Sequence, residues 1–260
     1  MKQFNKENKT EDSSVEDIKT VKLSKLTLHK LNKLEYFAIG ISIWFVFYPK
    51  PYLFVFTLLI LIPIVGIIIN GLHKPSIASL VEITIDEKNK GLKYDVADFI
   101  DIAAWAILIR IFMDHHFENF KSLVIPGLVS ISIITIILFL THKKIEQSNR
   151  NKFWIYASVI FNISVYSFAT TYGINCVYDF SEPKVFSTKI TDKTFTTRKG
   201  RKSYYIEIAP WGEHSQKEDI NVSLNEYENY SIGENIEVDL KEGFLNIPWF
   251  FVEKNEENNY

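Results

Sequence analysis

Cysteine is nearly absent from this chain of 260 residues. The single Cys176 can form no disulfide within the chain, and a cysteine-rich zinc site is excluded for the same reason. An excess of basic residues is also missing, because 29 Lys and Arg stand against 31 Asp and Glu. Proteins that bind nucleic acid normally present a basic face, so a nucleic-acid partner is not expected.

Sequence motifs of catalysis are missing as well. The chain has no Gly-x-Ser-x-Gly turn, no glycine-rich phosphate loop and no HExxH metal motif. His115 and His116 lie between Asp114 and Glu118 and could suggest a metal site. Adjacent histidines on a helix point about 100° apart, however, so they are poorly placed to bind the same metal ion. We therefore predict no metal, no cofactor and no enzymatic activity, and a membrane-embedded enzyme is the least favoured function.

The N-terminal segment has few large apolar side chains before Val21. Such a composition cannot bury enough surface to offset the entropy of ordering, so residues 1–30 are predicted to be a disordered, basic cytoplasmic tail. The first apolar run begins near Leu34, which is too far from Met1 for a secretory signal peptide. Residues 254–260 are predicted to be a second disordered tail.

Long hydrophobic runs are what the sequence has instead. A helix that rises 1.5 Å per residue needs about 20 apolar residues to cross a hydrocarbon core about 30 Å thick. Residues 31–175 are predicted to form a transmembrane helical domain. Its five predicted spans are residues 34–49, 52–72, 97–113, 122–141 and 153–175. Between the second and third spans, alternating Ile83 and Ile85 before a glycine-containing turn predict a short β-hairpin.

The third span decides the topology. Residues 97–113 carry Asp98, Asp101 and Arg110 in an otherwise apolar run, and omitting this span would place the basic loop 142–152 outside the cell. With five spans, every loop rich in Lys and Arg falls inside, as the positive-inside rule requires. We therefore favour five spans in the inner membrane, with the N-terminus in the cytoplasm and the C-terminal domain outside. With four spans that domain would be cytoplasmic.

Polar residues of the third and fifth spans lie at matching depths. Arg110 has Asp114 one helical turn later as a partner, and matching depth places Asp101 near Ser158 and Arg110 near Tyr166. The predicted intramembrane polar layer consists of Asp98, Asp101, Arg110, Asp114, Ser158, Asn162, Tyr166 and Thr170. The favoured interpretation is that these groups satisfy one another and hold the helices together. The alternative is a conduction or ligand pathway, which ionisable residues at depth often mark.

Beyond Asn175 the hydrophobic period changes from 3.6 to 2 residues. Five strands are predicted at residues 185–197, 203–211, 220–224, 236–240 and 244–252. Residues 183–253 are therefore predicted to form a small all-β domain of the OB or SH3 kind. The fold class is an α-helical membrane bundle followed by this domain. Its candidate recognition patch consists of Tyr205, Trp211, Trp249 and Phe250, although half of these rings are expected to fill the core.

Several stretches carry a resemblance to known proteins. They are ADFIDIAAWAILIR from Ala97, TYGINCVYDFSEPKV from Thr171, GRKSYYIEIAPWGEH from Gly200 and IGENIEVDLKEGFLNIPWFF from Ile232. The chain resembles a family of uncharacterised multi-span bacterial membrane proteins over most of its length after residue 35. This resemblance implies the same architecture and assigns no catalytic residue. The GENIEV pattern also resembles the C-terminal barrel of NfeD-type membrane proteins.

These observations predict an integral membrane protein of the cell envelope whose outward β-domain binds a partner or serves assembly. The expected partners are the lipid bilayer and an envelope protein or small ligand. A small transporter or ion-conducting protein that uses Asp98, Asp101 and Arg110 is the alternative function.

Overall fold

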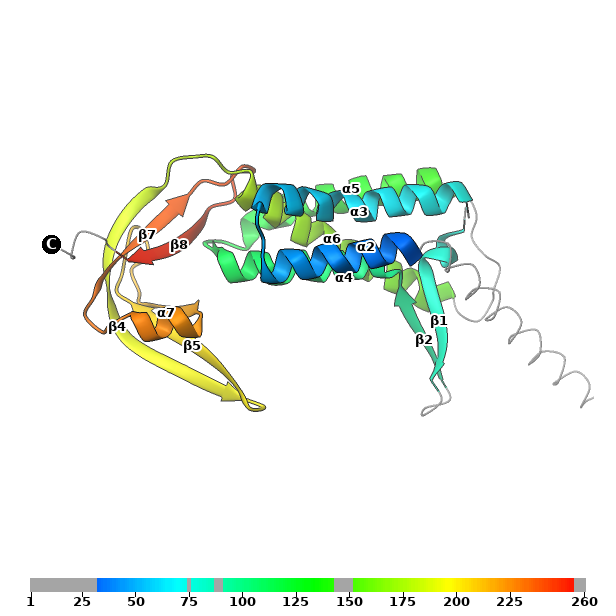
Figure 1. Ribbon diagram of the computed structural model, residues 1–260. Helices are drawn as coiled ribbons and strands as arrows, with labels where there is room; N and C mark the ends of the chain where they lie inside the picture. The colour runs from blue at the N-terminus through cyan, green and yellow to red at the C-terminus, as the bar shows by residue number, and fades with distance from the viewer. Residues whose placement is uncertain (1–31, 74–75, 87–90, 143–151, 255–260) are drawn as a thin grey trace, which may run out of the picture. The chain divides into compact units, whose positions relative to one another are not determined.

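The computed structural model describes residues 32–73, 76–86, 91–142 and 152–254 (Figure 1). The predicted tails and the interior of the basic loop 142–152 lie outside the described residues. The backbone divides into two units. The helical unit is Met1–Met113 with Leu123–Val177, and the β-unit is Asp114–Ser122 with Tyr178–Tyr260.

The helical unit holds long helices whose successive members run in opposite directions (Figure 1). They are α2 (Asn32–Phe47), α3 (Tyr52–His73), α4 (Asp98–Asp114), α5 (Lys121–Thr141) and α6 (Lys152–Val177). Within the described residues, three of them are long and apolar enough to cross a membrane, namely α3, α5 and α6. The shorter α2 and α4 have 16 and 17 residues.

Proline and glycine set how these helices meet. Pro49 and Pro51 follow the end of α2 and cannot continue a helix, so α2 and α3 form a tight hairpin. At Gly71 of α3, an added Cβ would lie 2.8 Å from the carbonyl oxygen of Thr141 in α5. At Gly173 of α6 it would meet the ring of Phe56 in α3 at 2.5 Å. These glycines let neighbouring helices approach more closely than any other residue would.

A short hairpin connects α3 to α4. The 3-10 turn η1 (Ile77–Leu80) leads into β1 (Val81–Asp86), which pairs antiparallel with β2 (Gly91–Val96). This confirms the hairpin predicted between the second and third spans. Because the hairpin joins the end of α3 to the start of α4, it lies at that end of the helical unit (Figure 1).

The β-unit is built on a curled antiparallel sheet that forms a half-barrel (Figure 1). Its strands are β3 (His116–Phe117), β4 (Lys184–Arg198), β5 (Arg201–Ile208), β6 (Glu218–Val222), β7 (Asn235–Lys241) and β8 (Trp249–Lys254). Their spatial order is β3-β8-β7-β4-β5-β6. In the β-unit, a short helix, α7 (Leu224–Asn229), lies between β6 and β7 in the chain.

The strands differ from the prediction where turn chemistry intervenes. The last predicted strand begins at Trp249 rather than at residue 244, because residues 243–246 form a turn in which Asn246 takes a positive φ of 56°. The second ends at Ile208, before Pro210, which has no N–H for a ladder. Helix α7 was not predicted. Its signal is the capping box of Ser223 and Glu226, in which each side chain bonds the other's backbone N–H.

One hydrophobic core holds the β-unit together. Alternate positions of the strands point inward, as the period of 2 requires. The buried side chains are Ile190, Ile206, Ile208, Trp211, Ile220, Tyr230, Ile236, Val238 and Phe250. Residues from β4 through β8 contribute to this core, so it forms only when the whole sheet is assembled.

Candidate functional site

The charged residues predicted for the membrane layer lie at the two ends of α4. Asp98 and Asp101 are in its first turn, where a carboxylate interacts favourably with the helix dipole. Asp101 Oδ1 also accepts a hydrogen bond of 2.7 Å from the N–H of Ile102. Near the other end, Arg110 Nη1 donates to the carbonyl oxygen of Val46 in α2 at 3.3 Å. Asp114 ends α4 and belongs to the β-unit.

The polar residues of α6 bond to helix backbones. The hydroxyl of Tyr166 donates to the carbonyl oxygen of Ile60, in the middle of α3. Asn162 Nδ2 donates to the carbonyl of Ser158 at 3.0 Å, and Thr170 Oγ1 donates to that of Tyr166 at 2.8 Å, both within α6. Thus Tyr166 of the predicted polar layer connects α6 to α3, whereas Asn162 and Thr170 bond within α6.

Among the described residues, Tyr166 and Arg110 of the predicted layer each form a hydrogen bond to another helix. Neither is one of the pairs that matching depth predicts. The pairs Asp101 with Ser158 and Arg110 with Tyr166 stay predictions. The bonds that are seen favour a role in holding the helices together.

Sequence reasoning missed a polar cluster at the end of α3. Asn70 Nδ2 donates to Ser79 Oγ at 2.6 Å and lies 3.1 Å from Nε2 of His142, which follows α5. Oγ1 of Thr141 lies 2.9 Å from the other ring nitrogen of His142. Burial lowers the pKa of His142, which favours the neutral ring. Asn70 and His142 are 72 positions apart, and only the lone amide in an apolar helix marks the cluster in the sequence.

The candidate recognition patch of the β-unit is largely interior. Trp211 and Phe250 belong to the core, with ring centroids 5.0 Å apart. Trp249 is also buried, and Tyr205 is half-buried. Half of these rings are expected to fill the core, and in the structure three of the four are buried. The physical reason is that aromatic rings on the inner side of the curled sheet bury the largest apolar area when they fill the core.

Asp179, just after α6, is held by three N–H groups. Its Oδ2 accepts from Trp249 Nε1 and from the backbone of Gly243, each at 2.9 Å, and its Oδ1 accepts from the backbone of Ser181 at 2.8 Å. Burial would raise the pKa of Asp179, but these hydrogen bonds outweigh it and lower the pKa. The Asp179 carboxylate thus connects the start of the β-unit to the segment that runs from Gly243 to the start of β8 at Trp249. Sequence reasoning missed it because its partners lie 64 and 70 positions away.

A second polar group surrounds His214. Its Nδ1 lies 2.6 Å from Glu218 Oε1, and its ring stacks on Trp211 with centroids 4.2 Å apart. Trp211 Nε1 donates to the other oxygen of Glu218 at 3.2 Å, and Glu118 Oε1 lies 3.9 Å from His214 Nε2. Within the part of the chain that the structure describes, no group of three or more His, Cys, Asp or Glu is placed to hold a metal ion. The hydrogen bonds of Glu218 to Trp211 and His214 stabilise the turn between β5 and β6.

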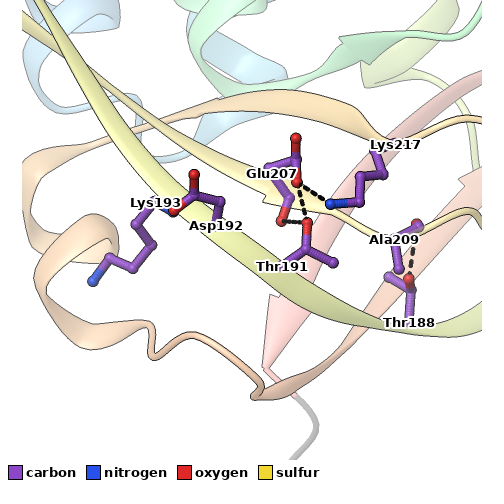
Figure 2. A network of polar contacts seen from close by, with 7 residues as sticks. All are labelled: Thr188, Thr191, Asp192, Lys193, Glu207, Ala209 and Lys217. Carbon is purple, nitrogen blue, oxygen red and sulfur yellow. Dashed lines mark hydrogen bonds and ion pairs between the residues drawn. The ribbon is translucent and has the colours of Figure 1, made fainter.

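A bulge in β4 carries the polar network of Figure 2. The pairing of β4 with β5 shifts between Ile190 and Asp192, which leaves Thr191 as the extra residue. The hydroxyl of Thr191 donates to the carboxylate of Glu207, and Lys217 Nζ donates to the same carboxylate at 2.7 Å (Figure 2). Hydrogen bonds from Lys217 and Thr191 lower the pKa of Glu207. The network fixes the point at which β4 bends.

Comparison with known proteins gives no match, whether with family models, with curated proteins or with solved structures. The family resemblance that the sequence suggests therefore stays a prediction.

Proposed function

We propose that the chain is an integral membrane protein of the cell envelope whose β-unit lies outside the cytoplasm and binds a partner or serves assembly. In this proposal all of α2 to α6 cross the inner membrane. The alternating helix directions and the clustering of Lys and Arg in the loops assigned to the cytoplasm support it. Helices of 16 and 17 residues span about 24 and 26 Å, and a bilayer accommodates such short spans by local thinning.

The observation that carries the proposal is the use of polar side chains inside the helical unit. A conduction pathway would need such groups to face an aqueous route. Instead, Tyr166 bonds α6 to α3 and Arg110 bonds α4 to α2. These side chains support a bundle that acts as an anchor, which leaves the β-unit as the part that meets a partner.

The finer fold of the β-unit is part of the same proposal. An OB-like or SH3-like domain is a small, strongly curled antiparallel sheet with a core of its own. The half-barrel of β4 to β8, with its single core cluster, supports an assignment to this kind of fold. Such domains are used widely for binding, so the fold is compatible with the proposed role and does not name the partner.

Tyr166→Phe tests the anchor role. Removing the hydroxyl deletes the bond to α3, so we expect the unfolding free energy of the full-length chain in detergent to fall by roughly 0.5–1.5 kcal/mol. Tyr36→Phe is the matched control, because Tyr36 in α2 is 72% exposed and should change nothing. Thermal unfolding of the three proteins in the same detergent gives the comparison.

The transporter alternative is tested in proteoliposomes. The anchor role predicts that wild type and a folded Asp101→Asn variant carry no more proton or sodium flux than empty liposomes. It also predicts that an impermeant amine cross-linker applied to intact cells joins the wild-type chain into an adduct of defined mass. A wild-type flux that the folded Asp101→Asn variant lacks would instead identify a pathway through α4, and the proposed function would be abandoned.

A further inference from the structure

The outer part of the β4–β5 hairpin is a strongly basic ribbon. From Lys193 to Ile206 the chain carries five cationic side chains and no acidic one, and these residues are here named the basic ribbon. The rest of residues 178–254 carries 14 acidic and 5 basic side chains. Outside the ribbon, residues 178–254 thus carry a net negative charge, so the ribbon is the segment that an anionic surface would attract.

The sheet leaves the outer end of the ribbon free. β7 pairs with β4 only as far as Lys189, and β6 pairs with β5 only from Tyr204 onward. Residues 196–203 are therefore paired to no third strand among those that the structure describes, and Figure 1 shows β4 and β5 continuing beyond α7. Every residue from 194 to 203 is exposed.

The ribbon is a regular β-hairpin whose base is held by hydrogen bonds. Lys199 and Gly200 form its two-residue turn, with positive φ values of 51° and 77°, the combination that suits the twist of a β-hairpin. At its base, Lys193 Nζ donates to the carbonyl oxygen of Tyr230 at 2.6 Å. Figure 2 shows Lys193 pointing away from the network of Thr191 and Glu207, so β4 is held on both sides where the ribbon begins.

The register gives the ribbon two different faces. Arg198 is directly opposite Arg201, and Thr196 is opposite Ser203, so these four side chains share one face. Like charges directly opposite one another repel, and an anionic group between them would relieve the repulsion. In the described residues, none of Arg198, Lys199, Arg201 and Lys202 forms an ion pair. The fork of two guanidinium groups beside two hydroxyls suits a phosphate group.

The other face combines a cation with an aromatic ring. Phe195 is opposite Tyr204, and Lys202 on the same face places its Nζ 5.1 Å from the centroid of the Phe195 ring. Phe195 is nevertheless 54% exposed. A cation beside an exposed aromatic ring is the combination that occurs where a protein meets the interfacial region of a bilayer, with the charge at the phosphates and the ring below them.

We propose that the basic ribbon docks edge-on on the phosphate headgroups of an anionic phospholipid membrane, so that Arg198 and Arg201 from one face and Lys202 and Phe195 from the other contact the lipid together. Because the helices anchor the chain in a bilayer, such phosphates are present at high local concentration. The inference deepens the proposed binding role and rests on it, since it names the partner of the β-unit.

An environment-sensitive NBD label at position 197 tests this docking. The full-length chain, with Cys176→Ala and Thr197→Cys, is placed in nanodiscs of zwitterionic or of partly anionic lipid, and anionic vesicles are added to the first kind. We expect a blue shift of the NBD emission with anionic lipid in either arrangement and no shift with zwitterionic lipid. The shift should be lost in 1 M salt, because the Debye length there is only about 3 Å. Gln216→Cys, in an exposed loop outside the ribbon, is the control position and should not shift.

Charge variants complete the test. Arg198→Gln with Arg201→Gln should require about 25-fold more anionic vesicle for the same shift, since each cation near such a surface strengthens binding roughly fivefold. Arg198→Lys with Arg201→Lys should retain most of the binding.

Several results would overturn the docking. The first two are no shift with anionic lipid and an equal shift at position 216. The third is a shift that soluble polyphosphate or a higher protein concentration produces but lipid does not, because it would identify a polymer or a second copy of the chain as the partner. If lipid contact fails while the flux and cross-linking results hold, only the partner is wrong and the proposed binding role stands.

Discussion

Ile206→Asp is expected to unfold the β-unit while the helical unit stays in the membrane. Ile206 is fully buried in β5, where its neighbours in the core are apolar. A carboxylate there would lose its hydration without gaining a partner, a cost of about 4 kcal/mol or more, which is comparable to the whole stability of a small domain. Limited proteolysis of the full-length chain in detergent should show residues 178–254 degraded and the helices intact.

Ser203→Asp is the matched control for this variant. It introduces the same charge on the same strand at an exposed position beside Arg201, so no loss of protection is expected. Glu207 is a poorer control, because its carboxylate already bonds Thr191 and Lys217. A protease-resistant β-unit in the Ile206→Asp variant would mean that the core described for β4 to β8 does not hold the unit together.

Asp179→Asn is expected to destabilise the β-unit by about 1–3 kcal/mol at neutral pH. Both oxygens of the Asp179 carboxylate accept hydrogen bonds, from Ser181, Gly243 and Trp249. An asparagine has one oxygen and one NH₂ group at these two places, so at least one of the three donors loses its partner. Denaturant unfolding of the full-length chain, followed by the protease resistance of the β-unit, measures the difference. Glu182→Gln is the control, since that nearby side chain is exposed.

The same carboxylate predicts a pH dependence. The pKa of Asp179 is lower in the folded protein than in the unfolded chain. Its contribution is therefore complete above the ordinary aspartate pKa, near 4, and is lost as the pH falls through the lowered pKa of the folded state. The stability difference between wild type and Asp179→Asn should hold from pH 7 to about 5 and shrink below about pH 4. An unchanged difference at pH 3 would contradict a carboxylate that is stabilised in its charged form.

The sequence predicts well whatever depends on one continuous segment. The run that begins at Tyr52 is uncharged through Leu72, and α3 occupies Tyr52–His73. Alternating Ile236, Val238 and Leu240 predict a strand, and β7 is Asn235–Lys241. In each case the hydrophobic period and a turn residue at each end carry the information locally.

The candidate sites were harder to predict because they depend on residues far apart in the chain. The partners of Asp179 and the contact of Asn70 with His142 have no local signature. The aromatic residues Trp211 and Phe250 show the same limit, since composition identifies them but only the curl of the assembled sheet decides that they face the core. The turn of the basic ribbon lies between the predicted strands 185–197 and 203–211, whereas the absence of a third strand beside it follows from where the pairing with β6 and β7 ends.

The side of the membrane on which the β-unit lies tests the central claim most directly. Gln216→Cys offers an exposed thiol in the β-unit, and the native Cys176 is only 4% exposed and should give little background. Ser148→Cys places a thiol in the basic loop that five spans assign to the cytoplasm. With an impermeant maleimide on intact spheroplasts, five spans predict that position 216 is labelled at once and position 148 only after the membrane is opened. The reverse pattern, with 148 labelled from outside and 216 only after lysis, would show that α4 does not cross the membrane and that the β-unit is cytoplasmic.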